Sequence, residues 1–277
     1  LYISMHRRLN SLLYFILIPP LLAFCPVMGV HIKTKGDFMF YYLLPTLMTY
    51  DFILVIAAVV PAIFLMIKAY RSDRLEKEPP ALLWDLTKAG IFSSLLALIA
   101  ERVLGTLLNL AVPQESVLYN VLLYFGIVAF AEEGAKYFMM KRHSWNIPAF
   151  NCQYDGVVYA VFVSLGFALW ENISYVMSYG FTTAIVRALT AIPGHACFGV
   201  FMGVFYGIAK KYDYRGNRGA SKTFRVLSVV LPAILHGAYD YIASAESSTW
   251  YFVGFVALLF IVSYLFVGRI SKTDQYI

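Results

Sequence analysis

The sequence predicts an all-α, polytopic integral membrane bundle of about eight transmembrane helices. Of its 277 residues, 60% are hydrophobic and only 14% are charged, whereas soluble domains carry about 25% charged residues. Apolar runs close to the roughly 20 residues needed to cross a bilayer recur along the whole chain. No polar stretch between these runs has room for a second core. We therefore expect residues 1–277 to form a single integral membrane domain, placed in the cell membrane.

The apolar runs follow one another at short intervals. They occupy residues 9–30, 42–67, 89–112, 117–140, 156–178, 183–209, 225–245 and 249–268. Between the second and third runs lies the most charged segment of the chain, residues 71–80, and its final Pro79-Pro80 stops any helix that continues from the second run. The three cysteines show neither CxxC spacing nor a pairing pattern, so no thiolate metal site is expected.

The basic residues predict the orientation of the helices. Sixteen lysines and arginines lie in alternate connections or chain ends on one side, and only Lys33 and Lys35 lie on the other. By the positive-inside rule both termini are cytoplasmic. This distribution also accounts for the net charge of +6, so we expect the lipid bilayer as the partner of the basic loops and no nucleic acid.

The fourth run contains two adjacent carboxylates, Glu132 and Glu133. A charged side chain at such a depth costs about 2.5 kcal/mol or more and usually marks a pathway or a site. Lys136 follows at helical spacing and can neutralise one carboxylate but not both. The other is left available as a proton acceptor. The alternative interpretation is a structural ion pair that holds two helices together.

The fifth and sixth runs add polar groups at similar depth. Glu171 and Asn172 are adjacent in the fifth run, far from its basic end. In the sixth run Pro193-Gly194 breaks the helix near mid-membrane, just before His195, and the unpaired backbone there must be satisfied by protein or water.

The seventh run places Pro232, His236 and Asp240 at four-residue intervals on one helical face. A carboxylate in this position commonly fixes the tautomer and orientation of an imidazole. The adjacent Glu101 and Arg102 of the third run point about 100° apart, so we expect each to pair with another helix in a structural role.

The small residues Gly199, Gly203 and Gly207 of the sixth run form a ridge. Such a ridge allows a neighbouring helix to approach closely, which predicts packing rather than chemistry.

Taken in order, these motifs resemble the PrsW family of intramembrane proteases, which is related to the CAAX prenyl endopeptidases and the bacteriocin-processing group. The resemblance covers residues 70–245 and also includes the connector 76–80 and Asp155-Gly156. It implies an endopeptidase that cleaves membrane-embedded or single-pass proteins, as the bacterial member that gave the family its name cleaves an anti-sigma factor. The motifs are Glu132-Glu133-xx-Lys136, Phe167-xxx-Glu171-Asn172, His195-xxx-Gly199 and His236-xxx-Asp240.

The predicted catalytic residues come from four of the runs. They are Glu132, Glu133, Glu171, His195, His236 and Asp240, with Lys136 and Asn172 in support. Two mechanisms fit. In one, His195, His236 and a carboxylate from Glu171 or Asp240 hold zinc, and Glu132 or Glu133 accepts the proton of its water. In the other, no metal takes part, a glutamate activates water directly, and the histidines with Asn172 stabilise the oxyanion.

Other classes of protein remain as alternatives. The sequence has no HExxH, no GxSG and no GxGD, so the usual zinc, serine and aspartyl arrangements are not predicted. A proton-coupled secondary transporter would also bury carboxylates and histidines beside broken helices. A non-catalytic protein that binds membrane helices would use the same polar focus.

Overall fold

The computed structural model describes residues 37–245 and 249–277. Within these residues the structure confirms the all-α prediction, and seven helices are long and apolar enough to cross a membrane. The predicted run 9–30 lies outside the described residues, and each of the other seven predicted runs corresponds to one of these helices. The single domain expected for residues 1–277 stays a prediction.

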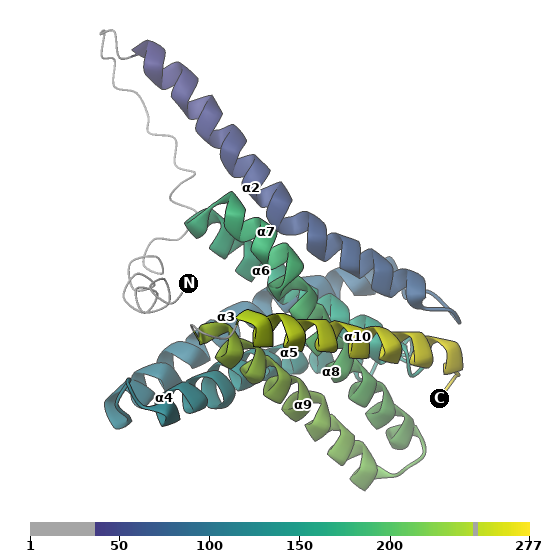
Figure 1. Cartoon of the computed structure of the whole chain (residues 1–277). Helices are drawn as coiled ribbons and strands as arrows, with labels where there is room; N and C mark the ends of the chain where they lie inside the picture. The colour runs from purple at the N-terminus through teal and green to yellow at the C-terminus, as the bar shows by residue number, and fades with distance from the viewer. Residues whose placement is uncertain (1–36, 246–248) are drawn as a thin grey trace.

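Figure 1 shows a helical bundle with α2 rising from it. Three basic segments lie toward the right of the view: the α2–α3 connection, the α8–α9 connection and the C-terminus. We call this side the basic end of the bundle. The elements are α2 (Asp37–Ser72), α3 (Pro80–Ala111), α4 (Val117–Val121), the π-helical segment η2 (Leu122–Val128), α5 (Ala129–Ser144), α6 (Asp155–Tyr179), α7 (Phe181–Leu189), α8 (Ala191–Tyr214), α9 (Arg218–Ser244) and α10 (Thr249–Thr273).

Two helix starts differ from the sequence prediction, and proline explains both. Helix α3 begins at Pro80, earlier than the predicted run at 89, because the first position of a helix does not need the N–H that proline lacks. The break in the sixth run falls at Thr190, which has non-helical dihedrals, rather than at Pro193. Pro193 lies in the first turn of α8, where a missing N–H removes no helical hydrogen bond.

Helix α6 forms the centre of the bundle and packs against α2, α3, α5 and α8. The glycine ridge predicted on α8 packs here as expected. A Cβ added to Gly203 would lie 2.4 Å from the Gly156 carbonyl oxygen, and one added to Gly207 would lie 2.2 Å from that of Gln153. On another face of α6, a Cβ on Gly166 would lie 2.3 Å from the Thr87 carbonyl oxygen of α3. Larger side chains would push these helices apart, so glycine fixes their spacing.

The helix that leads into α5 contains a wide turn. Along Leu122–Val128 the backbone is π-helical, and the Ala129 N–H donates to the Tyr124 carbonyl five residues back. Such segments are rare and are frequently found at functional sites. The extra residue per turn shifts the angular position of all later residues, so it helps to set the direction in which Glu132 and Glu133 point.

Candidate active site

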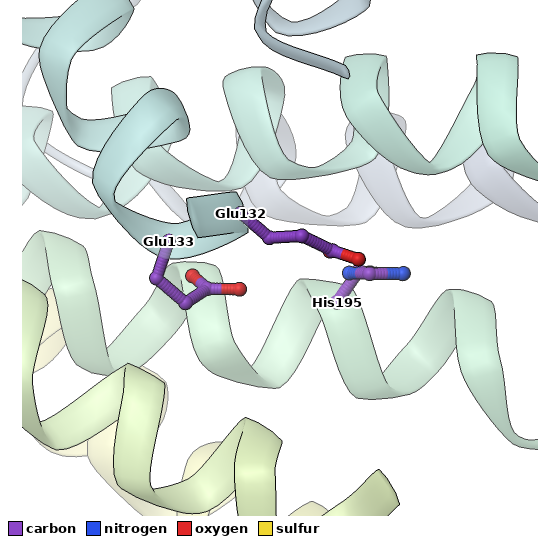
Figure 2. A group of neighbouring side chains, drawn as sticks. All are labelled: Glu132, Glu133 and His195. Atoms are coloured by element: carbon purple, nitrogen blue, oxygen red, sulfur yellow. The ribbon is translucent and has the colours of Figure 1, made fainter. Parts of the chain in front are cut away.

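A buried lysine lies at the centre of the polar residues. Lys136 Nζ donates to Glu133 Oε1 at 2.7 Å and to Glu132 Oε2 at 3.2 Å. It also lies 3.1 Å from His195 Nδ1 of α8 and 4.0 Å from the ring centroid of Phe167 on α6. Figure 2 shows both glutamates leaving α5, with the Glu132 side chain pointing toward His195. A single ammonium therefore contacts both adjacent carboxylates, with the shorter bond to Glu133.

His195 connects this centre to α6 and α7. Its Nε2 lies 2.8 Å from Glu171 Oε2, and Arg187 Nη2 of α7 donates to the same oxygen at 2.9 Å. Because Nε2 faces a carboxylate and Nδ1 faces an ammonium, the contacts favour the tautomer with the proton on Nε2 and a lone pair on Nδ1. Both ring nitrogens are thus engaged.

His236 connects the centre to α9. Its Nδ1 lies 3.0 Å from Glu133 Oε1 and 3.9 Å from Glu132 Oε2. Its Nε2 lies 3.5 Å from Asp240 Oδ2, so the pair predicted from their spacing forms. The ring stacks on Phe198 with the centroids 4.7 Å apart. This imidazole is held between carboxylates of two helices.

The six predicted catalytic residues thus lie in one continuous network across α5, α6, α8 and α9, although their roles stay predictions. Burial divides the network. Glu133 and Lys136 are fully buried, whereas the side chains of Glu171 and Asp240 are 24% and 26% exposed. Glu132 lies between these extremes at 9%. The network therefore has a closed inner part and an accessible outer part.

Two charged residues near the network were not predicted as part of the site. Arg187 supplies the cation that pairs with Glu171. The sequence could have indicated such a residue, because a carboxylate deep in the membrane needs a partner. Glu101 was expected to be structural, which stays a prediction, and it lies close enough to Glu132, Glu171, His236 and Asp240 for their charges to act on it. The sequence of α3 alone does not show which face of that helix meets α5.

Asn172 is held by backbone and side-chain partners. Its amide nitrogen donates to the Ala58 carbonyl of α2 at 2.7 Å, and its oxygen accepts from Arg187 Nε at 2.8 Å. These contacts favour a positioning role, and the predicted part in stabilising an oxyanion stays a prediction.

Comparison with known proteins decides the family. The family model described as PrsW family intramembrane metalloprotease matches residues 78–267. The chain belongs to the PrsW family. It is 32% identical over 207 residues to a Protease PrsW of Geobacillus kaustophilus, covering 75% of this chain and 87% of that relative. It is 40% identical over 124 residues to Protease PrsW of Bacillus subtilis, covering 45% and 55%. A Protease PrsW of Shouchella clausii is 30% identical over 225 residues, covering 80% and 98%. No solved structure matches.

Membership of the PrsW family confirms a protease of the membrane, and the seven apolar helices place this chain as a multi-pass protein. The substrate of such an enzyme is embedded in or attached to the membrane. The metal in the family description raises the question of which donor atoms could hold one.

Three donors of the network converge. Ligand atoms of Glu132, Glu133 and His195 lie within 4.8 Å of one another, and all three residues are buried. Two carboxylates and an imidazole suit an ion such as zinc, so these residues fit the metal of the family description. Lys136 Nζ contacts the same three side chains, so its ammonium and a metal would compete for them. These three residues share only His195 with the predicted metal ligands His195, His236 and Glu171. The predicted ligand set stays a prediction, and so does the choice of zinc as the metal.

Proposed function

We propose that this protein is an intramembrane endopeptidase in which Glu132 is the general base, accepting a proton from the water that attacks a peptide bond. The observation that supports this is the unequal engagement of the two glutamates by Lys136. Glu133 is fully buried and bonds both Lys136 and His236, whereas Glu132 has only the longer bond to Lys136, lies 3.9 Å from His236 Nδ1 and keeps 9% of its side chain exposed. A base needs a free oxygen that reaches water.

The remaining residues stabilise charge and fix geometry in this proposal. The Lys136 ammonium keeps Glu133 ionised, and Glu133 in turn orients His236. Both nitrogens of His236 face carboxylates, so in this proposal the ring is an imidazolium, and its Nε2–H, on the more exposed side, can donate to the developing oxyanion or give its proton to the leaving amine. Glu171 and Arg187 hold the tautomer of His195.

The residues that would hold a metal are Glu132, Glu133 and His195. When bound, a zinc ion supplies Lewis-acid polarisation of a carbonyl and a water of lowered pKa. Elemental analysis and chelation separate the two mechanisms. Metal-free protein with full, chelator-resistant cleavage supports the glutamate mechanism, while metal that is retained by the wild type and lost from Glu133→Gln supports a metalloprotease.

Cleavage of a single-pass membrane substrate by protein purified in detergent tests the general base. Glu132→Gln keeps the size and polarity of the side chain but removes its basicity, so the rate should fall by ~10² or more. Glu115→Gln, in an exposed turn, is the matched control and should cleave like the wild type. Undiminished cleavage by Glu132→Gln would contradict the proposal. A wild type that cleaves nothing in detergent would favour the transporter or the non-catalytic binding protein.

We further propose that the basic end of the bundle is cytoplasmic and that the substrate is a single-pass protein of the anti-sigma-factor kind. The charge count and the family resemblance support these statements. Cysteines introduced at Gln114 and Asn217, both exposed and at opposite ends of the spans, test the orientation with an impermeant thiol reagent. Labelling from outside at Gln114 alone is expected, and labelling at Asn217 would reverse it.

A further inference from the structure

A second group of carboxylates lies at the basic end of the bundle, away from the network around Lys136. Asp73 and Glu78 lie in the connection between α2 and α3, and Asp155 is the first residue of α6. They are 3%, 2% and 0% exposed, and their donor atoms lie within 4.8 Å of one another.

The carboxylate oxygens of this acidic cluster are poorly satisfied. Both oxygens of Asp73, Oε1 of Glu78 and Oδ1 of Asp155 are buried and have no hydrogen-bond partner among the described residues. The other oxygens do have partners: Glu78 Oε2 accepts from the Tyr159 hydroxyl at 2.9 Å, and Asp155 Oδ2 accepts from the Asn151 and Cys152 N–H groups at 3.0 and 2.6 Å. Buried charge without a partner is costly, so the unmatched oxygens call for a ligand.

The nearest cation is used elsewhere. Lys77 Nζ donates to backbone carbonyls at the end of α2, those of Tyr70, Arg71 and Asp73. No salt bridge in the described part of the chain involves Asp73, Glu78 or Asp155. Burial raises the pKa of the Glu78 carboxyl to about 7 and also raises the pKa of Asp73. The charge of Lys77 acts on Asp73 and lowers its pKa in part, but Lys77 forms no salt bridge with any of the three carboxylates, so the cluster has less positive charge than the network around Lys136.

Contacts from the C-terminal segment close over the cluster. The Tyr154 N–H donates to Asp274 Oδ1 at 3.1 Å, the Ile277 N–H donates to the Asn151 carbonyl at 2.8 Å, and Ser271 donates to the Ser72 carbonyl. Three segments that are far apart in sequence therefore meet at this point, and a ligand bound there would tie them together.

We propose that Asp73, Glu78 and Asp155 bind a hard divalent cation, of the Mg²⁺, Ca²⁺ or Mn²⁺ class, that joins the α2–α3 connection to the start of α6. Oxygen-only donors select this class, whereas zinc prefers sets that include nitrogen or sulfur. Three carboxylates supply enough negative charge for a divalent ion, and water completes its coordination shell. The ion would be structural and separate from any metal at Glu132, Glu133 and His195.

Thermal unfolding of the full chain in detergent tests this site. The protein is stripped with chelator and then titrated with Mg²⁺, Ca²⁺ or Mn²⁺ alone, in a Glu132→Gln background that disables the other candidate metal site. We expect the Tm to rise by a few degrees with a saturable dependence on concentration, because the ion binds the folded state. Asp73→Asn and Asp155→Asn should abolish the rise. Asp85→Asn, an exposed acid at the same end, should keep it.

A second measurement covers variants that fold poorly. Tb³⁺ substitutes for Ca²⁺ and luminesces when a nearby tyrosine is excited, and Tyr159 bonds directly to Glu78. We expect Tb³⁺ emission that Ca²⁺ displaces and that Tyr159→Phe lowers. Absence of a Tm response to all three ions would overturn the proposal and leave a proton shared between carboxyls as the way the cluster is satisfied. A response that persists unchanged in Asp73→Asn and Asp155→Asn would also overturn it, because the ion would then bind elsewhere.

Discussion

The network around Lys136 and the acidic cluster both gather carboxylates, but the two regions treat them differently. Within the membrane spans, Glu133 and Glu171 each bond a lysine or arginine as well as a histidine. At the basic end, Asp73 has no hydrogen-bond partner for either oxygen among the residues described. Where water is scarcest the chain supplies its own cations, because nothing else can. Nearer the surface, where ions are available, it leaves the positive charge to be supplied from solution.

Removing the Lys136 ammonium should have the largest effect on stability and cleavage. Lys136→Gln leaves Glu132 and Glu133 buried side by side without an ammonium, and breaking a buried ion pair from one side costs about 3–5 kcal/mol. We expect the free energy of unfolding to fall by that amount and cleavage to be lost. Lys88→Gln is the control, since its pair with Asp85 is about half exposed and exposed pairs contribute little to stability. Equal effects of the two changes would refute a central role for Lys136.

Lys136→Gln also tests whether a metal binds at Glu132, Glu133 and His195. If the ammonium competes with a metal for Glu132, Glu133 and His195, Lys136→Gln should bind zinc more tightly than the wild type. Calorimetric titration of both proteins measures this directly. Zinc affinity that is unchanged would show that the lysine and the metal do not share these ligands.

Arg187 should have the next largest effect. Arg187→Gln removes a charged hydrogen bond to Glu171 and the bond to Asn172, and bonds to charged groups contribute about 1.5–3 kcal/mol each. With Glu171 released, His195 loses its orientation, and cleavage should fall roughly tenfold. Arg187→Lys keeps the charge but not the planar guanidinium, so it should restore stability only in part. If Arg187→Gln cleaves like the wild type, Arg187 has no role in catalysis.

Asp240 should matter less than Arg187 for stability. Its contact with His236 is 3.5 Å long and its side chain is 26% exposed, so Asp240→Asn should leave the free energy of unfolding within about 1 kcal/mol of the wild type. Cleavage should still fall about tenfold, because the imidazole is less well oriented. A change in KM with no change in kcat would instead assign Asp240 to substrate binding.

In the acidic cluster, a neutralising substitution should raise the free energy of unfolding instead of lowering it. In the presence of chelator, Asp73→Asn removes a buried charge that has no partner, so the free energy of unfolding should rise by about 1 kcal/mol. No neutralising change in the Lys136 network should stabilise the protein. Urea unfolding in mixed micelles compares the two regions. A fall in stability at Asp73 without any cation present would show that the protein already satisfies this carboxylate.

Much of the site could be predicted from the sequence because polar residues in apolar runs are conspicuous. Glu132, Glu133, His195 and His236 were identified as one focus, and the structure brings them together. Arg187 was missed because it lies near a helix end, where a basic residue has an ordinary topological explanation. The structural role expected for Glu101 stays a prediction.

The fold was predicted less evenly than the site. Length and hydropathy located the spans, but the break before α8 was placed at Pro193 because proline is the stronger signal in a sequence. In the structure the break falls at Thr190, because a proline is accommodated in the first turn of a helix. The wide turn in Leu122–Val128 contains Gly126 but no proline, and a single glycine does not distinguish it from an ordinary helix, so only the structure reveals it.

The buried position of α6 has a consequence for how the protein is made. Ribosomes deliver the chain from its N-terminus, so α6 reaches the membrane before α8, whose glycine ridge covers the face of α6 that carries Gly156, Ala160 and Ser164. Lipid must cover that side in the interval, and Gly156, Ala160 and Ser164 present no charge to it. Glu171 receives its arginine from α7, which is the next helix to emerge. The order of helices along the chain thus shields the intermediate before the bundle is complete.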